Sequence, residues 1–378
     1  MSTPALRIVH ATECAASGTL DVIVCLAHEL AAAGARQCVV YSPRAETPAN
    51  LAGRFPAGVE FACVPAARGL HLAFARDFHA ALSATVRTFD PDVLHLHSSK
   101  AGFIGRAARA VHRWPCRVLY SPHGLSFLDP AARARNAVFR ALEWLAARDG
   151  AVPVGCGRGE AELLTRLSRC PALLLENCIE DFFLGIERQP DARPTIVTVG
   201  RLSRQKAPDS FAAVACRVRA EVPQTRFVWV GDGEPHYRRE LEAAGVEVAG
   251  WCTREAVAGY LASAHLYLQT SRWEGLPIAV IQALAAGVPC VVNDCVGNRD
   301  AVSHGVDGFV ENSEFALAAA VVRVLADQHL RVRLGAAARI EAARRFSRAA
   351  FRVQVRRLYG ITESLAAPGP LEAHVASA

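Results

Sequence analysis

Residues 271–293 read SRWEGLPIAVIQALAAGVPCVVN, and this stretch is the strongest indicator of the architecture. Its fourth residue is the carboxylate Glu274, and Pro277 suits the first turn of a helix, where its missing N–H leaves no intrahelical bond unmade. Apolar residues continue to Ala286, and Gly287 then ends the helix before a short buried strand. The stretch therefore predicts half of a βαβ unit, whose helix begins with free N–H groups that suit an anion.

The same residues allow a second interpretation, because Gly275 to Val292 is an uncharged run at the lower length limit for a membrane span. Pro277, Gly287 and Pro289 interrupt this run. The interruption falls where a helix-to-strand turn is expected, so we interpret the run as a core helix and strand of a folded α/β domain.

Short apolar strands alternate with helical stretches on both sides of a polar segment, residues 187–193, which we interpret as a linker. The alternation predicts an α/β chain with two Rossmann-like, doubly wound parallel-sheet domains. We expect the first domain at residues 1–180 and the second at 190–344. A final helix at about 345–365 is expected to pack back onto the first domain, and the tail from Ala366 to fray.

The bulk composition indicates a folded, reducing-compartment protein. With 52% hydrophobic and 21% charged residues in 378, the chain has enough apolar side chains for a large core. Its twelve cysteines are scattered without a Cys-x-x-Cys pair, and the start lacks a basic-then-apolar signal sequence. We therefore expect free thiols and a cytoplasmic location.

The net charge of +6 is concentrated in the first half of the chain. Seven arginines in two successive segments carry much of the excess: Arg106, Arg109, Arg113, Arg117, Arg133, Arg135 and Arg140. One interpretation is a solvated helix face, and the other is a patch that contacts anionic lipid or a phosphorylated acceptor. Nucleic acid is a poor candidate, because no aromatic-interleaved basic stretch or zinc-finger spacing occurs.

Residues that follow strands are the first candidates for a binding site, since open parallel sheets bind ligands at the carboxyl ends of their strands. Gly18 follows the first strand, and Arg201 and Lys206 follow the first strand after the linker. Of 42 basic residues only Lys100 and Lys206 are lysines, which suggests a specific need for a compact charge. Arg201 and Lys206 together would neutralise a diphosphate; the alternative is two solvent-facing bases.

Glu274 stands beside the expected anion-binding helix end, although a carboxylate repels phosphate. The contradiction disappears if Glu274 holds sugar hydroxyls or a developing positive charge. Glycosyl transfer needs this combination, because the anomeric carbon becomes cationic while the departing phosphate gains negative charge.

These residues carry a family resemblance. The segments EGLPIAVIQALAAGVPCVV and VGRLSRQK resemble hallmark segments of the retaining, nucleotide-sugar-dependent glycosyltransferases of family 4, which have the GT-B fold. The resemblance covers nearly the whole chain and implies two domains facing across a cleft, a UDP- or GDP-linked sugar donor, and no metal ion or other cofactor. It also implies a glycan or lipid-linked acceptor in cell-surface polysaccharide biosynthesis, with peripheral contact at the cytoplasmic face of the membrane.

The resemblance also assigns roles. It implies catalytic roles for His123, near the anomeric centre, and for Glu274, on the donor sugar or phosphate. A histidine that ends a strand is otherwise often a capped core residue. The implied donor-binding residues are Gly18, Arg201, Lys206, Gly275, Leu276, Pro277 and Gln282.

The chain departs from the family pattern at Gln282, where the family usually has a second glutamate that contacts the ribose. A neutral hydrogen bond contributes about 1 kcal/mol against about 1.5 to 3 kcal/mol for a charged one, so we expect weaker donor binding. Val296 and Asp300 also replace the usual Gly and Glu. Gln282 leaves a non-catalytic nucleotide-sugar-binding subunit as the alternative function. An NAD-dependent oxidoreductase is disfavoured because no Gly-x-Gly-x-x-Gly follows the first strand.

Asp90-Pro91-Asp92 followed by His95 and His97 imitates a metal-binding motif. The two carboxylates precede the strand, whereas the histidines lie within it on one face, about 7 Å apart along the chain. The carboxylates would therefore lie at the wrong edge of the sheet. We expect no metal site from these residues.

Overall fold

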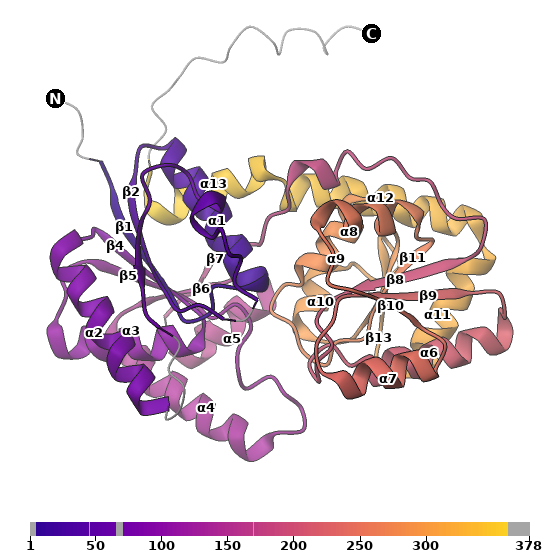
Figure 1. Ribbon diagram of the computed structural model, residues 1–378, viewed down its shortest axis with the longest axis horizontal. Coiled ribbons are helices and arrows are strands. Elements are labelled where there is room, and N and C mark those ends of the chain that lie inside the picture. Colours follow the sequence, from indigo (N-terminus) through magenta and orange to yellow (C-terminus); the bar gives the residue numbers. More distant parts are fainter. Residues whose placement is uncertain (1–4, 45, 66–70, 169, 362–378) are drawn as a thin grey trace, which may run out of the picture.

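The computed structural model describes residues 5–44, 46–65, 71–168 and 170–361. They form two α/β units, each built on a parallel sheet (Figure 1). The first contains a seven-stranded sheet in the order β3-β2-β1-β4-β5-β6-β7, and the second a six-stranded sheet in the order β10-β9-β8-β11-β12-β13. In each sheet the chain starts at a central strand, winds to one edge, and returns to the other side. This doubly wound order confirms the predicted fold class.

The first unit is built from short strands and their crossover helices. Its strands are β1 (Arg7–Thr12), β2 (Arg36–Tyr41), β3 (Glu60–Cys63), β4 (Val93–His97), β5 (Arg117–Ser121), β6 (Val152–Gly155) and β7 (Leu173–Leu174). Its helices are α1 (Ser17–Ala32), α2 (His71–Phe89), α3 (Ser99–His112), α4 (Arg133–Ala146) and α5 (Arg158–Ser168), with 3-10 turns η1 (Ala52–Arg54), η2 (Ala147–Asp149) and η3 (Asp181–Phe183).

The second unit repeats this alternation. Its strands are β8 (Thr195–Val199), β9 (Arg226–Val230), β10 (Glu247–Gly250), β11 (Leu266–Gln269), β12 (Cys290–Asn293) and β13 (Gly308–Glu311). Its helices are α6 (Pro208–Glu221), α7 (Pro235–Ala243), α8 (Arg254–Ser263), α9 (Ile278–Ala285), α10 (Val296–Ala301), α11 (Glu314–Ala326) and α12 (Gln328–Phe346).

Residues 271–293 form the end of one βαβ crossover, as predicted. Pro277 lies one position before the expected place, as the N-cap of α9 with ψ 112°, so its ring fixes the chain as it enters the helix. Strand β12 pairs with β11 and β13 in parallel, and Val291 is fully buried. No helix in the described part of the chain is long and apolar enough to cross a membrane.

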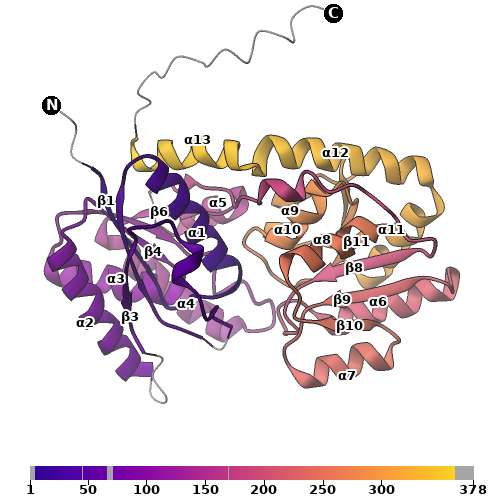
Figure 2. The ribbon, with the colours of Figure 1, turned by 45° about the horizontal axis from the view of Figure 1, so that its top comes forward.

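Helices α12 and α13 (Arg348–Tyr359) run along one side of both units and connect the second back to the first (Figure 2). We expected one long helix, but the chain breaks at Ser347, which has extended ψ and whose hydroxyl accepts the N–H of Ala350. A serine N-cap favours a new helix start over continuation. Phe351 and Tyr359 of α13 are buried in the core of the first unit.

The linker residues lie against the second unit, where the N–H groups of Gln189 and Asp191 donate to carbonyls at the end of α8. The domain limits of 1–180 and 190–344 remain a proposal. The predicted fraying tail, and the last residues of the expected helix at 345–365, lie outside the described residues.

Candidate active site

A cleft of about 780 Å³ lies between the two units and is lined by residues of both. The loops that follow β1 and β8 reach it, and so does the segment that follows β11. The order in which strands are added reverses beside β1 in the first sheet and beside β8 in the second. The cleft therefore lies at both topological switch points. All nine predicted site residues line it: Gly18, His123, Arg201, Lys206, Glu274, Gly275, Leu276, Pro277 and Gln282.

The Lys206 ammonium and the Glu274 carboxylate form an ion pair on the second-unit wall of the cleft. Lys206 Nζ lies 2.6 Å from Glu274 Oε1, and the amide of Gln269 donates to the same oxygen at 3.1 Å. The Glu274 side chain is only 7% exposed and that of Lys206 is 21% exposed. A pair this close in a partly dry site interacts far more strongly than it would in water.

Hydrogen bonds join the loop that carries Lys206 to the loop that carries Glu274. The Thr270 hydroxyl donates to the Lys206 carbonyl at 3.1 Å, and the Gln205 amide donates to the Trp273 carbonyl at 2.9 Å. The parent strands β8 and β11 are neighbours in the sheet. The loop that carries the lysine and the loop that carries the glutamate therefore form one rigid wall.

Gly275 and Gly18 allow the two units to approach each other closely at the cleft. A Cβ on Gly275 would lie 2.9 Å from both the Sγ of Cys156 and the backbone nitrogen of Gly124. A Cβ on Gly18 would lie 3.1 Å from Cδ1 of Ile278, the first residue of α9. Neither position therefore has room for a larger residue unless its neighbours move.

Arg201 and Arg204 each contact a carboxylate of the first unit across the mouth of the cleft. Arg201 pairs with Glu46 at 3.6 Å, and Arg204 pairs with Asp129, which is almost fully buried and also binds Arg135 at 2.8 Å. Neither Asp129 nor Arg204 was predicted as a site residue: Asp129 lies in no motif, and Arg204 belongs to the segment VGRLSRQK but had no role of its own assigned. These pairs link the two units at the entrance to the site.

His123 follows β5 and faces the cleft in an unusual backbone conformation. Its φ is +53°, in the left-handed region that side chains rarely adopt. Nε2 of His123 lies 2.9 Å from Nδ1 of His97, and burial lowers the pKa of His123 to about 4. At neutral pH the ring is therefore uncharged, which suits hydrogen bonding better than charge stabilisation.

Glu160, which was not predicted as a site residue, holds the turn that contains His123. Its side chain is fully buried, and its two oxygens accept the N–H groups of Gly124 at 2.7 Å and Cys156 at 2.8 Å. One carboxylate thus joins the turns that follow β5 and β6. Burial raises the pKa of Glu160, and the two backbone donors oppose that effect.

The predicted basic patch is smaller than expected. Arg106 is 4% exposed, pairs with Glu143 at 2.7 Å and stacks on the Tyr120 ring, and Arg109 bonds the Asp149 carbonyl. These two arginines are structural, so their inclusion in the surface patch was wrong. Arginines of α4, treated below, remain exposed.

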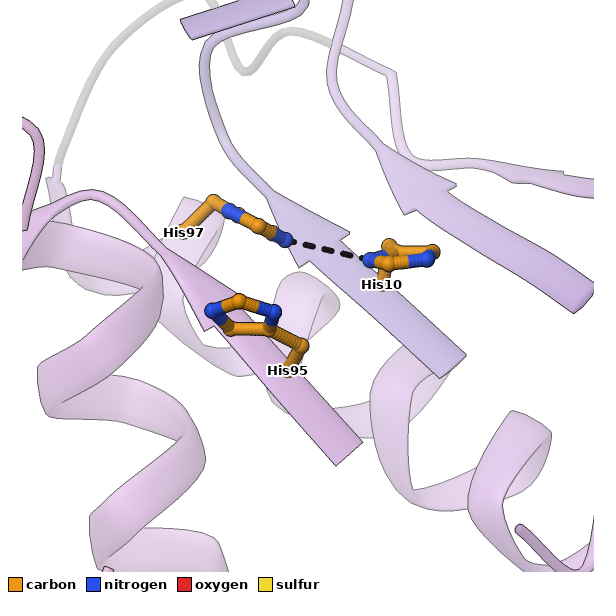
Figure 3. A group of neighbouring side chains, drawn as sticks. All are labelled: His10, His95 and His97. Carbon is orange, nitrogen blue, oxygen red and sulfur yellow. Dashed lines mark hydrogen bonds between the residues drawn. The ribbon is translucent and has the colours of Figure 1, made fainter. Parts of the chain in front are cut away.

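The two histidines of the motif at residues 90–97 lie in a cluster with His10, and the aspartates of that motif are not part of it. His10, His95 and His97 each offer a nitrogen within 4.8 Å of the others, and all three are buried (Figure 3). Asp92 lies elsewhere and accepts the Arg7 N–H at 2.8 Å. The sequence could not show this cluster, because His10 belongs to another strand.

Comparisons with known proteins match both units. Residues 17–175 match the glycosyl transferase 4-like domain, and residues 193–327 match the model described as glycosyl transferases group 1. The two matches include the loops that line the cleft.

Two curated relatives cover most of the chain. One is the UDP-Gal:alpha-D-GlcNAc-diphosphoundecaprenol alpha-1,3-galactosyltransferase of Escherichia coli, 27% identical over 64% of this chain and 68% of its own length. The other is the GDP-mannose-dependent alpha-mannosyltransferase of Mycolicibacterium smegmatis, 28% identical over 67% of this chain and 69% of its own.

Solved structures agree on the fold. Sucrose-phosphate synthase from Thermosynechococcus elongatus superposes with a TM-score of 0.81 at 19% identity, covering 94% of this chain and 98% of that one. Anabaena HepE, solved in complex with UDP and glucose, superposes with a TM-score of 0.76 at 15% identity, covering 94% and 99%. The chain belongs to the group 1 glycosyltransferases, the nucleotide-sugar-dependent enzymes of family 4 with the GT-B fold.

Proposed function

We propose that this chain transfers a hexose from a UDP- or GDP-linked donor to an acceptor hydroxyl, with retention of configuration, in cell-surface glycan biosynthesis. The observation that carries the proposal is the meeting of Arg201, Lys206 and the start of α9 in one cleft with His123 and Glu274. The first three suit a diphosphate, and the last two suit the sugar attached to it.

In the proposed step the bond between the anomeric carbon and the β-phosphate oxygen breaks, and a bond to the acceptor oxygen forms on the same face. The acceptor proton passes to the departing phosphate oxygen. Arg201, Lys206 and the N–H groups at the start of α9 stabilise the charge that gathers on the phosphate. His123 binds the reacting sugar from the opposite unit.

Glu274 has two tasks in this scheme. Through Oε1 it holds Lys206 and Gln269 in place, as the contacts of 2.6 and 3.1 Å indicate. We assign its second oxygen, Oε2, to hydroxyl groups of the donor sugar. A carboxylate near the anomeric carbon also favours the positive charge that develops there.

The Glu274→Gln variant tests this role. We expect turnover to fall about 100-fold, the scale of losing one preorganised electrostatic contact, with smaller effects on binding of the nucleoside diphosphate. Glu187→Gln, a change of an exposed linker residue, is the matched control. Wild-type turnover in Glu274→Gln would refute the placement of Glu274 at the reacting sugar.

The donor is tested by a thermal-shift panel of UDP, GDP and ADP, each with its hexose conjugates, followed by transfer and hydrolysis assays. The relatives named above use UDP-Gal and GDP-mannose, so we expect the largest shift with a UDP or GDP donor. A nucleotide-sugar shift without transfer or hydrolysis, with any acceptor offered, would favour the non-catalytic binding subunit instead.

Helix α4 supports a membrane-bound acceptor. It has no buried residue and exposes an apolar stripe, spaced along one face, of Val138 (58% exposed), Leu142 and Leu145 (56%). Exposed Arg133 and Arg140 lie on the same helix. Apolar and cationic groups together on one surface helix fit the headgroup region of an anionic bilayer. Because Arg135 of α4 lines the cleft, a lipid-linked acceptor at this bilayer would lie near the site.

Vesicle co-sedimentation of the full chain tests whether the exposed face of α4 binds a membrane. We expect binding to phosphatidylglycerol-containing vesicles at low salt, and little binding to pure phosphatidylcholine. Replacing Val138, Leu142 and Leu145 with serine should abolish binding. A control triple change of exposed residues elsewhere should not affect it: Val332→Ser, Ile340→Ser and Val353→Ser. Equal binding by both triple variants would contradict the assignment to α4.

A further inference from the structure

A row of buried polar side chains crosses the first sheet behind His123. Strands β2, β1, β4 and β5 are neighbours in this order. Gln37 lies on β2, His10 on β1, and His97 on β4, while His123 follows β5. The row lies on the face covered by α1 and α13, which also buries an apolar cluster. Such groups are costly to bury unless they bond to one another.

Hydrogen bonds join the three histidines in series. Nδ1 of His10 lies 3.1 Å from Nε2 of His97, as Figure 3 shows, and Nδ1 of His97 lies 2.9 Å from Nε2 of His123. The ring of His95 lies against that of His97, tilted by 33° with 4.0 Å between centroids, and His95 is itself held by the Tyr359 hydroxyl at 2.6 Å. His97 therefore has little freedom to turn.

The three rings are neutral at physiological pH. Burial lowers the pKa of His10 to about 4 and lowers the pKa of His97 well below its usual value. A neutral imidazole has one N–H donor and one acceptor nitrogen. In a chain of such rings, the tautomer of one ring fixes the tautomers of all the others.

Gln37 sets the direction of this chain. Its Nε2 donates to the Ala27 carbonyl at 2.9 Å, so the Oε1 that remains is an acceptor. This Oε1 and Nε2 of His10 are both buried, and neither has a hydrogen-bond partner within normal distance among the described residues. Gln37 also opposes the effect of burial on the pKa of His10, as an acceptor facing an N–H group does. A proton on Nε2 of His10 would give the Gln37 oxygen a donor and leave Nδ1 of His10 as an acceptor.

We infer that His10 and His97 are positioning residues that hold His123 as the Nε2–H tautomer, with Nδ1 as a hydrogen-bond acceptor for a hydroxyl of the donor sugar. His10 accepts from Nε2–H of His97, and His97 accepts from Nε2–H of His123. The role at the sugar rests on the proposed function, whereas the tautomer does not. The acceptor role differs from that of a general acid, which would need a proton on Nδ1.

Histidine-selective ¹⁵N labelling and long-range ¹H–¹⁵N correlation spectra of the full chain test the tautomer without a donor. Signals are assigned with single variants at His10, His97 and His123. We expect neutral Nε2–H rings for all three between pH 6 and 8. A proton on Nδ1 of His123 would overturn the inference, and so would stoichiometric metal in the purified protein by mass spectrometry, because an ion would occupy the lone pairs.

Two variants test the effect on catalysis. His97→Leu removes the acceptor for His123, and we expect kcat/KM for the donor to fall about tenfold, the scale of one hydrogen bond, while the thermal shift by free nucleotide stays unchanged. His97→Asn places an amide oxygen near the position of Nδ1 and should restore most of the loss. Equal loss in both variants would overturn the positioning role. Absent turnover in the wild type, with the expected tautomers, would instead refute the proposed function.

Discussion

The ion pair between Lys206 and Glu274 reduces the positive charge that Lys206 presents to a ligand. Because Lys206 already pairs with Glu274 at 2.6 Å, an arriving diphosphate meets a lysine whose charge is partly compensated. The lysine still attracts phosphate, since its side chain remains 21% exposed toward the cleft. The pairing holds the ammonium in place before the donor arrives, which reduces the entropy lost on binding.

The Lys206→Ala variant should therefore lose the thermal shift caused by the preferred nucleoside diphosphate, because it removes a charge-assisted contact and leaves Glu274 buried without its partner. We expect affinity to fall at least tenfold, measured by calorimetric titration. Lys100→Ala, a change of the only other lysine, is the matched control and should bind normally. An unchanged shift in Lys206→Ala would contradict the diphosphate assignment.

Among the elements, those with local signals were predictable and those that depend on distant partners were not. The helix and strand after Glu274 follow from apolar periodicity, Pro277 and Gly287, so the sequence predicted them to within one residue. The break at Ser347 was missed, because a serine inside an Arg-rich helical pattern gives a weak signal. The histidine row could not be predicted, because it depends on β1 lying between β2 and β4.

The buried histidines of the first sheet predict that the protein loses stability in acid. Burial lowers the pKa values of His10, His95, His97 and His123 in the folded state, and Arg117 lowers that of His95 further. The unfolded chain therefore binds more protons below pH 6.5. Stability is fully present above pH 6.5 and falls as the pH falls toward 4, by up to about 1.4 kcal/mol per pH unit for each histidine.

Melting temperatures between pH 7.5 and 4.5 measure this dependence. His10→Asn keeps an oxygen near the position of Nδ1 but cannot bind a proton in this range, so its melting temperature should fall less steeply with pH. The comparison uses slopes, because the variant also changes packing. Equal slopes for His10→Asn and the wild type would contradict the contribution of His10.

At the scale of the whole molecule, the two units meet through polar contacts around the cleft and through apolar ones, since Cys156 of the first unit belongs to the same buried cluster as Leu276 and Val280 of the second. Arg204 pairs with Asp129 at the mouth, and Gly159 donates its N–H to Asp300 at 2.8 Å on another side. Helices α12 and α13 cover both units along one edge (Figure 2). The position of the cleft between the sheets was predictable from the family resemblance, whereas these contacts were not, since each partner comes from a loop without a motif.

The pair between Arg201 and Glu46 competes with the donor, because the guanidinium assigned to the diphosphate contacts a first-unit carboxylate at 3.6 Å. Both side chains are partly exposed, at 41% and 35%, and such pairs contribute about 0 to 1 kcal/mol. Glu46→Gln should therefore tighten binding of the nucleoside diphosphate by up to about fivefold in calorimetric titrations at low salt. The gain should shrink in 0.5 M NaCl, where surface charges are screened.

Glu60→Gln is the matched control for Glu46→Gln, because Glu60 forms a similar exposed pair with Arg36 at 3.2 Å on the far edge of the first sheet. It should leave the affinity unchanged at both salt concentrations. If Glu46→Gln weakened binding instead, Glu46 would be acting with Arg201 to orient the donor, and the two units would close on the diphosphate through that pair. The sign of one change in affinity therefore distinguishes a competing interdomain contact from a cooperating one.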